Sequence, residues 1–223
     1  MSIALPGDGF ELDDCENSDT KKIGPGLMYR NDKIISTKPG ILHKENNKVW
    51  LESSQKRYIP SLNDPVVGIV TAKLTDFYRV DIGSHQLAIL PNLAFESATK
   101  RNRPNLNVGS VVYARVTVAN KDLEPEISCM SILNKSDGFG ELSDGFIVHC
   151  STGLCKRTLK PDSQILEGVG SNFTFECATG LNGRIWIKAN SNKETIQLSM
   201  VLKRLDYSPD DNISGIIEEI LSK

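Results

Sequence analysis

The chain has 223 residues, which suits one large domain or two to three small ones, since single domains mostly hold ~100–150 residues. Hydrophobic residues make up 39% and charged residues 24%, so the composition excludes a disordered, collagen-like or coiled-coil protein. Lys plus Arg total 26 against 28 for Asp plus Glu, and the net charge of −2 lacks the overall basicity of a stand-alone nucleic-acid binder. The protein therefore either avoids nucleic acid or binds it locally, as part of something larger.

The first residues lack the basic character of a signal peptide, and no apolar run approaches the ~18–20 residues of a membrane span. We therefore expect a soluble, intracellular protein with no membrane partner. The five cysteines contain no C-x-x-C pair, which favours reduced structural thiols. No metal-ligand or nucleophile motif accompanies the three histidines, so we expect no metal, no cofactor, no catalytic residue and no small-molecule substrate.

Short strands separated by turn signals fill residues 1–62, and they predict a small N-terminal β domain. Two hairpins are expected there, one turning at the Asn-Asp pair 31–32 and one at the Asn-Asn pair 46–47. Gly7 and Asp8 belong to a Pro-Gly-Asp turn. We interpret this turn as an interface element that positions the domain on a neighbour, in preference to a metal site.

Residues 63–135 carry longer strands, expected at 66–74, 77–82, 86–90, 110–118 and 126–132. Five strands within about 70 residues suit a small barrel of the OB type. Alternation along the second strand leaves Phe77 and Arg79 outside the barrel, and alternation along the fourth leaves Tyr113 and Arg115 outside. These four side chains are candidates for an RNA-stacking platform, worth ~1–3 kcal/mol per stacked base. A structural role for Tyr113 is the alternative.

Residues 136–223 alternate strands and helices. Strands are expected at 146–150, 173–178 and 184–189, and helices at 152–160, 163–169, 198–205 and 213–221. The order strand, helix, helix, strand, strand, helix is that of a eukaryotic-type KH domain. The chain is thus predicted to be an α+β protein of three modules.

The charges are unevenly distributed over these modules. Residues 64–135 hold 8 basic and 7 acidic side chains, whereas residues 136–223 hold 9 basic and 12 acidic ones. The positive middle module also contains the run Lys100, Arg101, Asn102 and Arg103. Such a run offers phosphate contacts that position an RNA strand without reading its sequence. A solvated basic loop is the alternative.

The tetrapeptide from Gly180 to Gly183 superficially resembles the G-x-x-G loop by which KH domains clamp RNA. Here it joins two strands, and the Asn182-Gly183 pair is a hairpin signal in which both residues take positive φ. We therefore assign Gly180, Asn182 and Gly183 to a structural turn. Residues 159–164, where a clamp belongs, contain no glycine, so the KH domain is predicted to be degenerate for RNA binding.

Trp186 alternates with two isoleucines in the last strand of this module. Apolar side chains on both faces of one strand indicate burial against another module or subunit. We therefore expect Trp186 to be an interface anchor, because aromatic side chains dominate such contacts.

Stretches that run in order through all three modules carry a family resemblance; they are 5–8, 56–60, 98–104, 113–115, 124–127 and 180–188. In these stretches the chain resembles the cap subunits of the eukaryotic RNA exosome. The resemblance implies an N-terminal β domain, an OB barrel of the ribosomal protein S-one type and a KH domain, in a subunit without catalytic activity.

The same resemblance implies the partners. Such a subunit sits on a ring of six RNase-PH-like proteins beside other cap subunits, and it guides single-stranded RNA into the central channel for 3′-to-5′ degradation and rRNA processing. The resemblance also implies that the basic run lies at the channel mouth. It further implies that the protein is found in the nucleus, including the nucleolus, and in the cytoplasm.

Two other functions remain open from the residues. A free-standing RNA-binding regulator would use the barrel and the KH domain, although the net charge and the missing clamp glycines argue against useful affinity of the isolated chain. A nuclease would need a carboxylate cluster or a histidine pair, and the sequence offers no sign of either.

Overall fold

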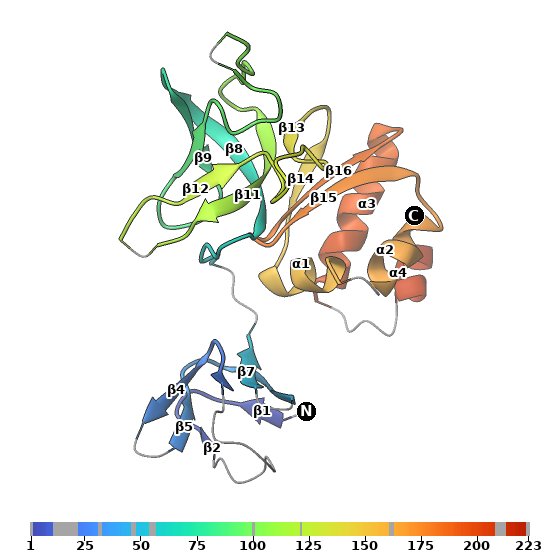
Figure 1. Cartoon of the computed structure of the whole chain (residues 1–223). Helices are drawn as coiled ribbons and strands as arrows, with labels where there is room; N and C mark the ends of the chain where they lie inside the picture. The colour runs from blue at the N-terminus through green and yellow to red at the C-terminus, as the bar shows by residue number, and fades with distance from the viewer. Residues whose placement is uncertain are drawn as a thin grey trace. The chain divides into compact units, whose positions relative to one another are not determined.

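The structure is a computed structural model that describes residues 2–10, 22–30, 33–45, 48–53, 57–99, 101–120, 122–160, 163–207 and 213–221. The chain divides into two compact units, Met1–Gln55 and Lys56–Lys223, which we describe separately (Figure 1). Within the described ranges, no helix is long and apolar enough to cross a membrane.

The N-terminal unit consists of two small sheets. One has the strand order β1 (Ser2–Ala4), β6 (Gly40–Glu45), β7 (Lys48–Glu52) and β3 (Lys22–Ile23), and the other β2 (Gly9–Phe10), β5 (Lys33–Ser36) and β4 (Leu27–Arg30). The two predicted hairpins are confirmed as the antiparallel pairs β4–β5 and β6–β7, while their turn residues lie outside the described ranges. Ala4, Leu42, Val49 and Leu51 form a small core.

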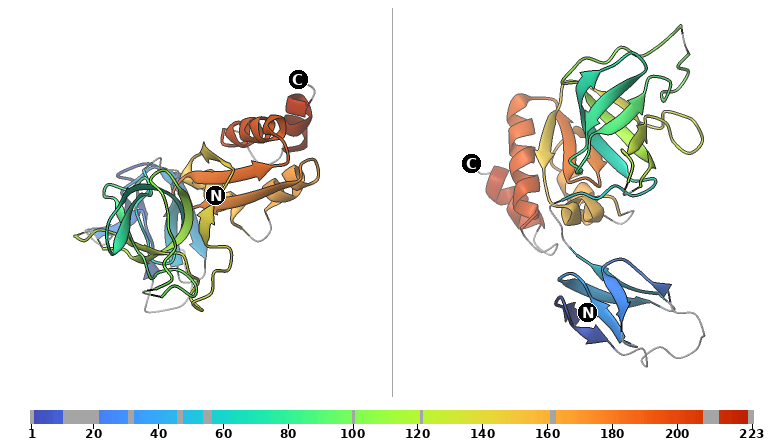
Figure 2. Two further views of the ribbon diagram at one scale, coloured as in Figure 1. Left: turned by 90° about the horizontal axis from the view of Figure 1, so that it is seen from above. Right: turned by 90° about the vertical axis from the view of Figure 1, so that its left-hand side faces the viewer.

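The second unit begins with the barrel. Its strands are β8 (Pro65–Lys73), β9 (Phe77–Asp81), β10 (Ala88–Pro91), β11 (Val111–Val118) and β12 (Glu126–Ser128). The sheet order β12-β10-β9-β8-β11, with β12 also pairing with β11, closes the ring and confirms the predicted five-stranded barrel; the left view of Figure 2 looks into it.

The barrel core follows the alternation of the strands, because every second residue of β9, and of β11 up to Val116, is buried. Tyr58 packs into this core and donates a hydrogen bond from its hydroxyl to Asp64 at 2.9 Å. The first compact unit ends at Gln55, before Tyr58, whereas the expected boundary of the N-terminal domain was residue 62. At the other end, β13 (Gly140–Leu142) pairs with β11, so the barrel sheet also continues past residue 135.

The KH-type domain follows with β14 (Phe146–His149), α1 (Thr152–Thr158), α2 (Gln164–Gly170), β15 (Phe175–Gly180), β16 (Arg184–Ala189), α3 (Asn192–Leu205) and α4 (Ile213–Leu221). This order confirms the predicted KH arrangement. The side chains of Ser151 and Ser191 cap α1 and α3 by accepting backbone N–H groups, at 3.1 and 3.2 Å. The expected start signal of the last helix, at residues 208–211, lies outside the described ranges.

The three-stranded sheet β14-β16-β15 is apolar on both faces and lies between the helices and the barrel (Figures 1 and 2). Ile185 and Ile187 belong to the cluster that the helices cover. Trp186, between them, points the other way and packs with Val67 of the barrel. The Trp186 contact is therefore one between two domains of the same chain.

The tip of the β15–β16 hairpin is bound to the barrel by the carboxamide of Asn182. Its Nδ2 group donates to the carbonyl oxygens of Val67 and Ile82, at 2.8 and 2.9 Å, and its Oδ1 accepts from the Val67 N–H at 3.2 Å. Asn182 is only 6% exposed, so water does not compete for these bonds. The amide thus supplies hydrogen-bond partners to backbone groups of the barrel strands that would otherwise have none.

Arg184 adds a charged contact beside this amide. Its Nη1 donates to the Asp81 carbonyl oxygen and its Nη2 to the Asp81 carboxylate, both at 2.6 Å. Burial alone would raise the pKa of Asp81, but the hydrogen bonds from Arg184 and from the Gly83 N–H, with the charge of Arg184, leave the pKa below its ordinary value. Asp81 therefore stays ionised and paired.

The geometry of the hairpin turn differs from the expectation. Gly180 pairs with Arg184, which leaves a three-residue loop, and of its residues Gly183 alone has positive φ, at 76°. The prediction of positive φ at Asn182 was therefore wrong. A three-residue hairpin needs the left-handed conformation at one position, which is Gly183, and this frees Asn182 to turn its side chain into the barrel.

We expect Asn182→Ala to lower the free energy of unfolding of the second unit by about 2–4 kcal/mol, because it strands buried polar groups of Val67 and Ile82. Urea unfolding, followed by the fluorescence of Trp186 in a Trp50→Phe background, measures the change. Asn190→Ala, at an exposed position, is the matched control and should alter stability little. Equal stability of both variants would contradict the role of the amide.

Candidate RNA-binding face of the barrel

The connection between β10 and β11 contains the basic run, and we call residues 96–107 the basic loop. Tyr78 of β9 fastens it to the barrel, since its hydroxyl donates to the Pro104 carbonyl oxygen at 2.7 Å and accepts from the Leu106 N–H at 3.3 Å. Leu106 is buried in the barrel core. The second half of the loop is therefore held in place by a core tyrosine.

A tight turn presents the tip of the loop. The Thr99 N–H donates to the Asn102 carbonyl oxygen at 3.0 Å, and the Asn102 N–H donates to the Thr99 hydroxyl at 3.1 Å. Arg101 and Asn102 are exposed on this turn. Lys100 lies outside the described residues.

Arg103 and Lys73 both link the basic loop to the region where β8 ends and the turn to β9 begins. The Thr75 carbonyl oxygen accepts from Arg103 Nη1 at 3.2 Å and from Asn92 Nδ2 at 2.9 Å. Lys73, at the end of β8, donates through Nζ to the Asn105 side chain. The basic loop and this turn therefore form one cationic end of the barrel.

The structure divides the four expected platform residues between two places. Phe77 and Arg79 share β9, and Phe77 directly follows the β8–β9 turn. Tyr113 and Arg115 lie on β11, which β8 separates from β9 in the sheet. The four side chains consequently do not form one surface.

Arg79 has a carboxylate partner, because its Nη1 lies 3.3 Å from Oε1 of Glu124. Both side chains are more than a third exposed, so the pair contributes little to stability. An RNA phosphate would have to compete with Glu124 for this guanidinium.

Tyr113 is packed between the barrel and the KH-type domain. Its ring stacks on Phe139 with 4.9 Å between centroids, and its hydroxyl lies 3.3 Å from the Thr179 carbonyl oxygen, to which it donates. Burial, with a smaller effect of Cys177, raises the pKa of Tyr113 to about 12, so the hydroxyl keeps its proton. These contacts favour the structural role of Tyr113, the alternative to stacking on RNA, because a neighbouring ring and domain already cover it.

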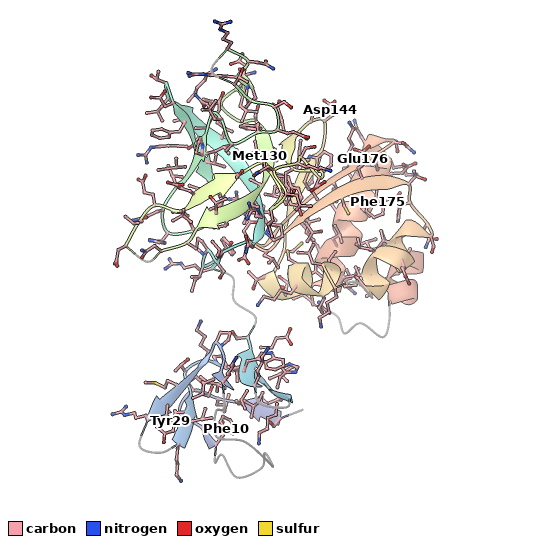
Figure 3. The ribbon with its side chains drawn as sticks, viewed as in Figure 1. Phe10, Tyr29, Met130, Asp144, Phe175 and Glu176 are labelled. Atoms are coloured by element: carbon pink, nitrogen blue, oxygen red, sulfur yellow. The ribbon has the colours of Figure 1, made fainter. Side chains whose placement is uncertain are left out.

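Arg115 is directed to the barrel's own backbone. Its Nε donates at 3.2 Å to the carbonyl oxygen of Met130, a residue labelled in Figure 3, and its Nη1 donates to Asn63 Oδ1 at 2.5 Å. Arg115 thus ties the end of β12 to the turn before β8. We leave it out of the candidate face, which consists of Lys73, Phe77, Arg101 and Arg103.

The Gly7–Asp8 turn closes within the N-terminal unit. The Leu5 N–H donates to the Asp8 carboxylate at 2.7 Å, and the Gly7 N–H, with φ at 98°, donates to the Ser36 carbonyl oxygen at 2.8 Å. These bonds stabilise the turn itself. Its expected contact with a neighbouring protein stays a prediction.

The sequence did not identify three residues that contribute contacts in the barrel, because their hydrogen-bond partners are distant in the chain. Lys73 was partly detectable as a cation at the exposed end of the first barrel strand, but its partner Asn105 lies 32 residues away. Arg184 and Glu124 gave no local signal, since they lie 103 and 45 residues from their partners.

Three family models match the chain in order. They are described as the Rrp40 N-terminal domain of an exosome complex exonuclease at residues 22–57, the S1 domain of exosome complex component RRP40 at 58–140, and a KH domain at 145–193. The fold and these matches define a protein of the S1–KH class found in exosome complexes.

Relatives cover most of the chain. The exosome complex component RRP40 of Drosophila melanogaster is 41% identical over 99% of this chain and 97% of its own length. The human protein of that name is 40% identical over 88% of this chain and 74% of its own length. The Saccharomyces cerevisiae protein of that name is 37% identical over 87% of this chain and 85% of its own length. The chain belongs to the RRP40 family of exosome complex components, the ribosomal RNA-processing protein 40 family.

A solved structure supports the fold independently. The crystal structure of a protein described as an exosome complex RNA-binding protein matches 74% of this chain and 98% of its own, with a TM-score of 0.62 and 22% identity.

We expect Tyr113→Phe to lower the free energy of unfolding by about 0.5–1.5 kcal/mol through loss of the bond to Thr179, and to leave RNA affinity unchanged. Urea unfolding and RNA titration of one preparation measure both. Tyr207→Phe, at an 88% exposed position, is the matched control and should change neither. Weaker RNA binding by Tyr113→Phe alone would return this residue to the RNA interface.

Proposed function

We propose that this chain is a non-catalytic cap subunit of the RNA exosome. It stabilises the ring of RNase-PH-like subunits, together with other cap subunits, and guides single-stranded RNA into the central channel for 3′-to-5′ degradation and processing, including that of rRNA. Family membership supports the assignment to the complex. The cationic end of the barrel is the single observation that supports the contact with RNA.

The contacts are directed to the RNA backbone. Arg101 and Arg103 belong to the basic loop, which is linked to the β8–β9 turn through Arg103 and to Lys73 through Asn105, and such cations bind phosphates without reading the bases. Few such contacts give weak, salt-dependent binding. Weak binding suits a subunit along which RNA has to move.

The KH-type domain contributes packing in this proposal. Its hairpin turn is occupied by the barrel through Asn182, and its sheet lies between the barrel and the helices. A free-standing regulator would need this domain to hold RNA, so we do not propose that function.

The basic loop provides the test. We expect the triple variant Lys100→Glu, Arg101→Glu, Arg103→Glu to assemble normally but to slow degradation of long single-stranded RNA several-fold in a reconstituted exosome, because reversed charges repel phosphates. Size-exclusion chromatography and RNA decay measure assembly and turnover, and repetition at higher salt should reduce the difference.

The control reverses three exposed cations elsewhere, Lys193, Lys203 and Arg204 of α3, and so gives the same net charge. We expect this control variant to degrade RNA at the rate of the unsubstituted complex. Equal turnover by the basic-loop variant would contradict the guiding role, and RNA hydrolysis by the purified chain alone would contradict the non-catalytic one.

We also propose that the protein is present in the nucleus, with the nucleolus, and in the cytoplasm, as its role in rRNA processing requires. Imaging of a tagged chain expressed from its own locus measures this distribution. Exclusion of the tagged chain from the nucleus would contradict it.

A further inference from the structure

An open hollow of about 450 Å³ lies under the basic loop, within the ~300–1,000 Å³ range of small-ligand pockets. Both arms of the loop line it, the first through Glu96 and the second through Asn102. Its remaining wall comes from the segment after β12, with Ser136 and Phe139. The hollow is therefore part of the same barrel end as the candidate RNA-binding face.

The lining of the hollow includes two aromatic side chains that other residues hold in place. The ring of Phe139 is held by stacking on Tyr113, and the backbone of Phe95 is held by a parallel β-bridge to Cys129. Cys129 is fully buried, and this burial raises the pKa of its thiol to about 12, so the thiol is neutral. A flat aromatic ligand finds apolar contacts with these two rings.

Glu96 and Asn102 add two polar groups of different character to the lining. Glu96 Oε2 accepts the Ser136 N–H at 2.8 Å, and the hydrogen bonds from Ser136 lower the pKa of Glu96, so its carboxylate is ionised and only accepts. The backbone of Asn102 is fixed by Thr99, while its carboxamide makes no hydrogen bond with the described residues. That carboxamide offers both donors and an acceptor.

This combination suits a base and not a phosphate. An ionised carboxylate repels a phosphate, so Glu96 would oppose backbone binding inside the hollow. It accepts readily from the amino groups of guanine, adenine and cytosine, and guanine adds a ring N–H next to its amino group. Arg101 and Arg103 flank Asn102 in the sequence, so cations are available near the hollow for the phosphates of the same nucleotide.

We propose that this hollow receives one unstacked base of single-stranded RNA and selects a base with an exocyclic amino group, guanine above all, through Glu96 and Asn102. The inference rests on the proposed function, because the basic loop has to bring the strand to the hollow. It adds a local sequence preference to contacts that otherwise ignore sequence.

The test uses the full chain and four uridine hexamers that differ in one central base, G, A, C or U, with affinities measured by fluorescence anisotropy at low salt. We expect the G oligomer to bind about fivefold or more tightly than the all-U oligomer, as one bidentate base contact allows. Glu96→Gln and Asn102→Ala should reduce this ratio toward one. Glu167→Gln, at an exposed position of α2, is the matched control and should leave it unchanged.

A second measurement detects base recognition even when the affinity for RNA is weak. In NMR titrations with guanosine and uridine 5′-monophosphate, the side-chain amide signals of Asn102 should shift saturably with the guanosine nucleotide and less with the uridine one. Equal affinities for all four hexamers, a preference for uracil, or no shift at Asn102 would overturn the inference.

The basic-loop triple variant separates this result from the proposed function. If that variant weakens all four hexamers alike while the unsubstituted chain shows no base preference, the guiding role stands and the pocket inference alone fails. If the variant weakens none of them, the proposed contact between the basic loop and RNA fails.

Discussion

The arrangement of the second unit depends on the amide of Asn182. A single side chain meets the polar groups of two barrel strands at once, and it does so where water is excluded. Leaving those groups unpaired would cost about 1–3 kcal/mol each, so the hairpin and the barrel are held in one relation. The Arg184–Asp81 contact and the packing of Trp186 on Val67 add to this attachment of the hairpin to the barrel.

This docking decides which side of the barrel is open to RNA. The KH-type domain covers part of β11, where Tyr113 contacts Thr179, so that strand serves the domain junction. The basic loop and the β8–β9 turn are exposed at the cationic end, with Phe77 at the start of β9. One hydroxyl, that of Tyr78, links this end to the barrel core, because it bonds both Pro104 and Leu106.

Periodicity predicted most of the fold. Alternation marked β9 and most of β11, and the apolar stripe of α3 marked its buried face, because both patterns are local in sequence. The candidate site was only partly predictable. A run of cations is visible in the sequence, whereas the contacts that remove Tyr113 and Arg79 from a platform span 66 and 45 residues. The same holds for Asn182, which has the residue type of a turn but partners 115 residues away.

The near balance of charge follows from this division of roles. The barrel concentrates its cations in one loop, while the acidic KH-type domain uses its hairpin and sheet for packing. With two of the four outward residues engaged by the protein and a third paired to Glu124, the barrel retains few groups that can bind RNA. Affinity along an RNA strand then has to be shared with other subunits. A chain that contributes a short cationic end suits a complex in which RNA passes over several proteins in turn.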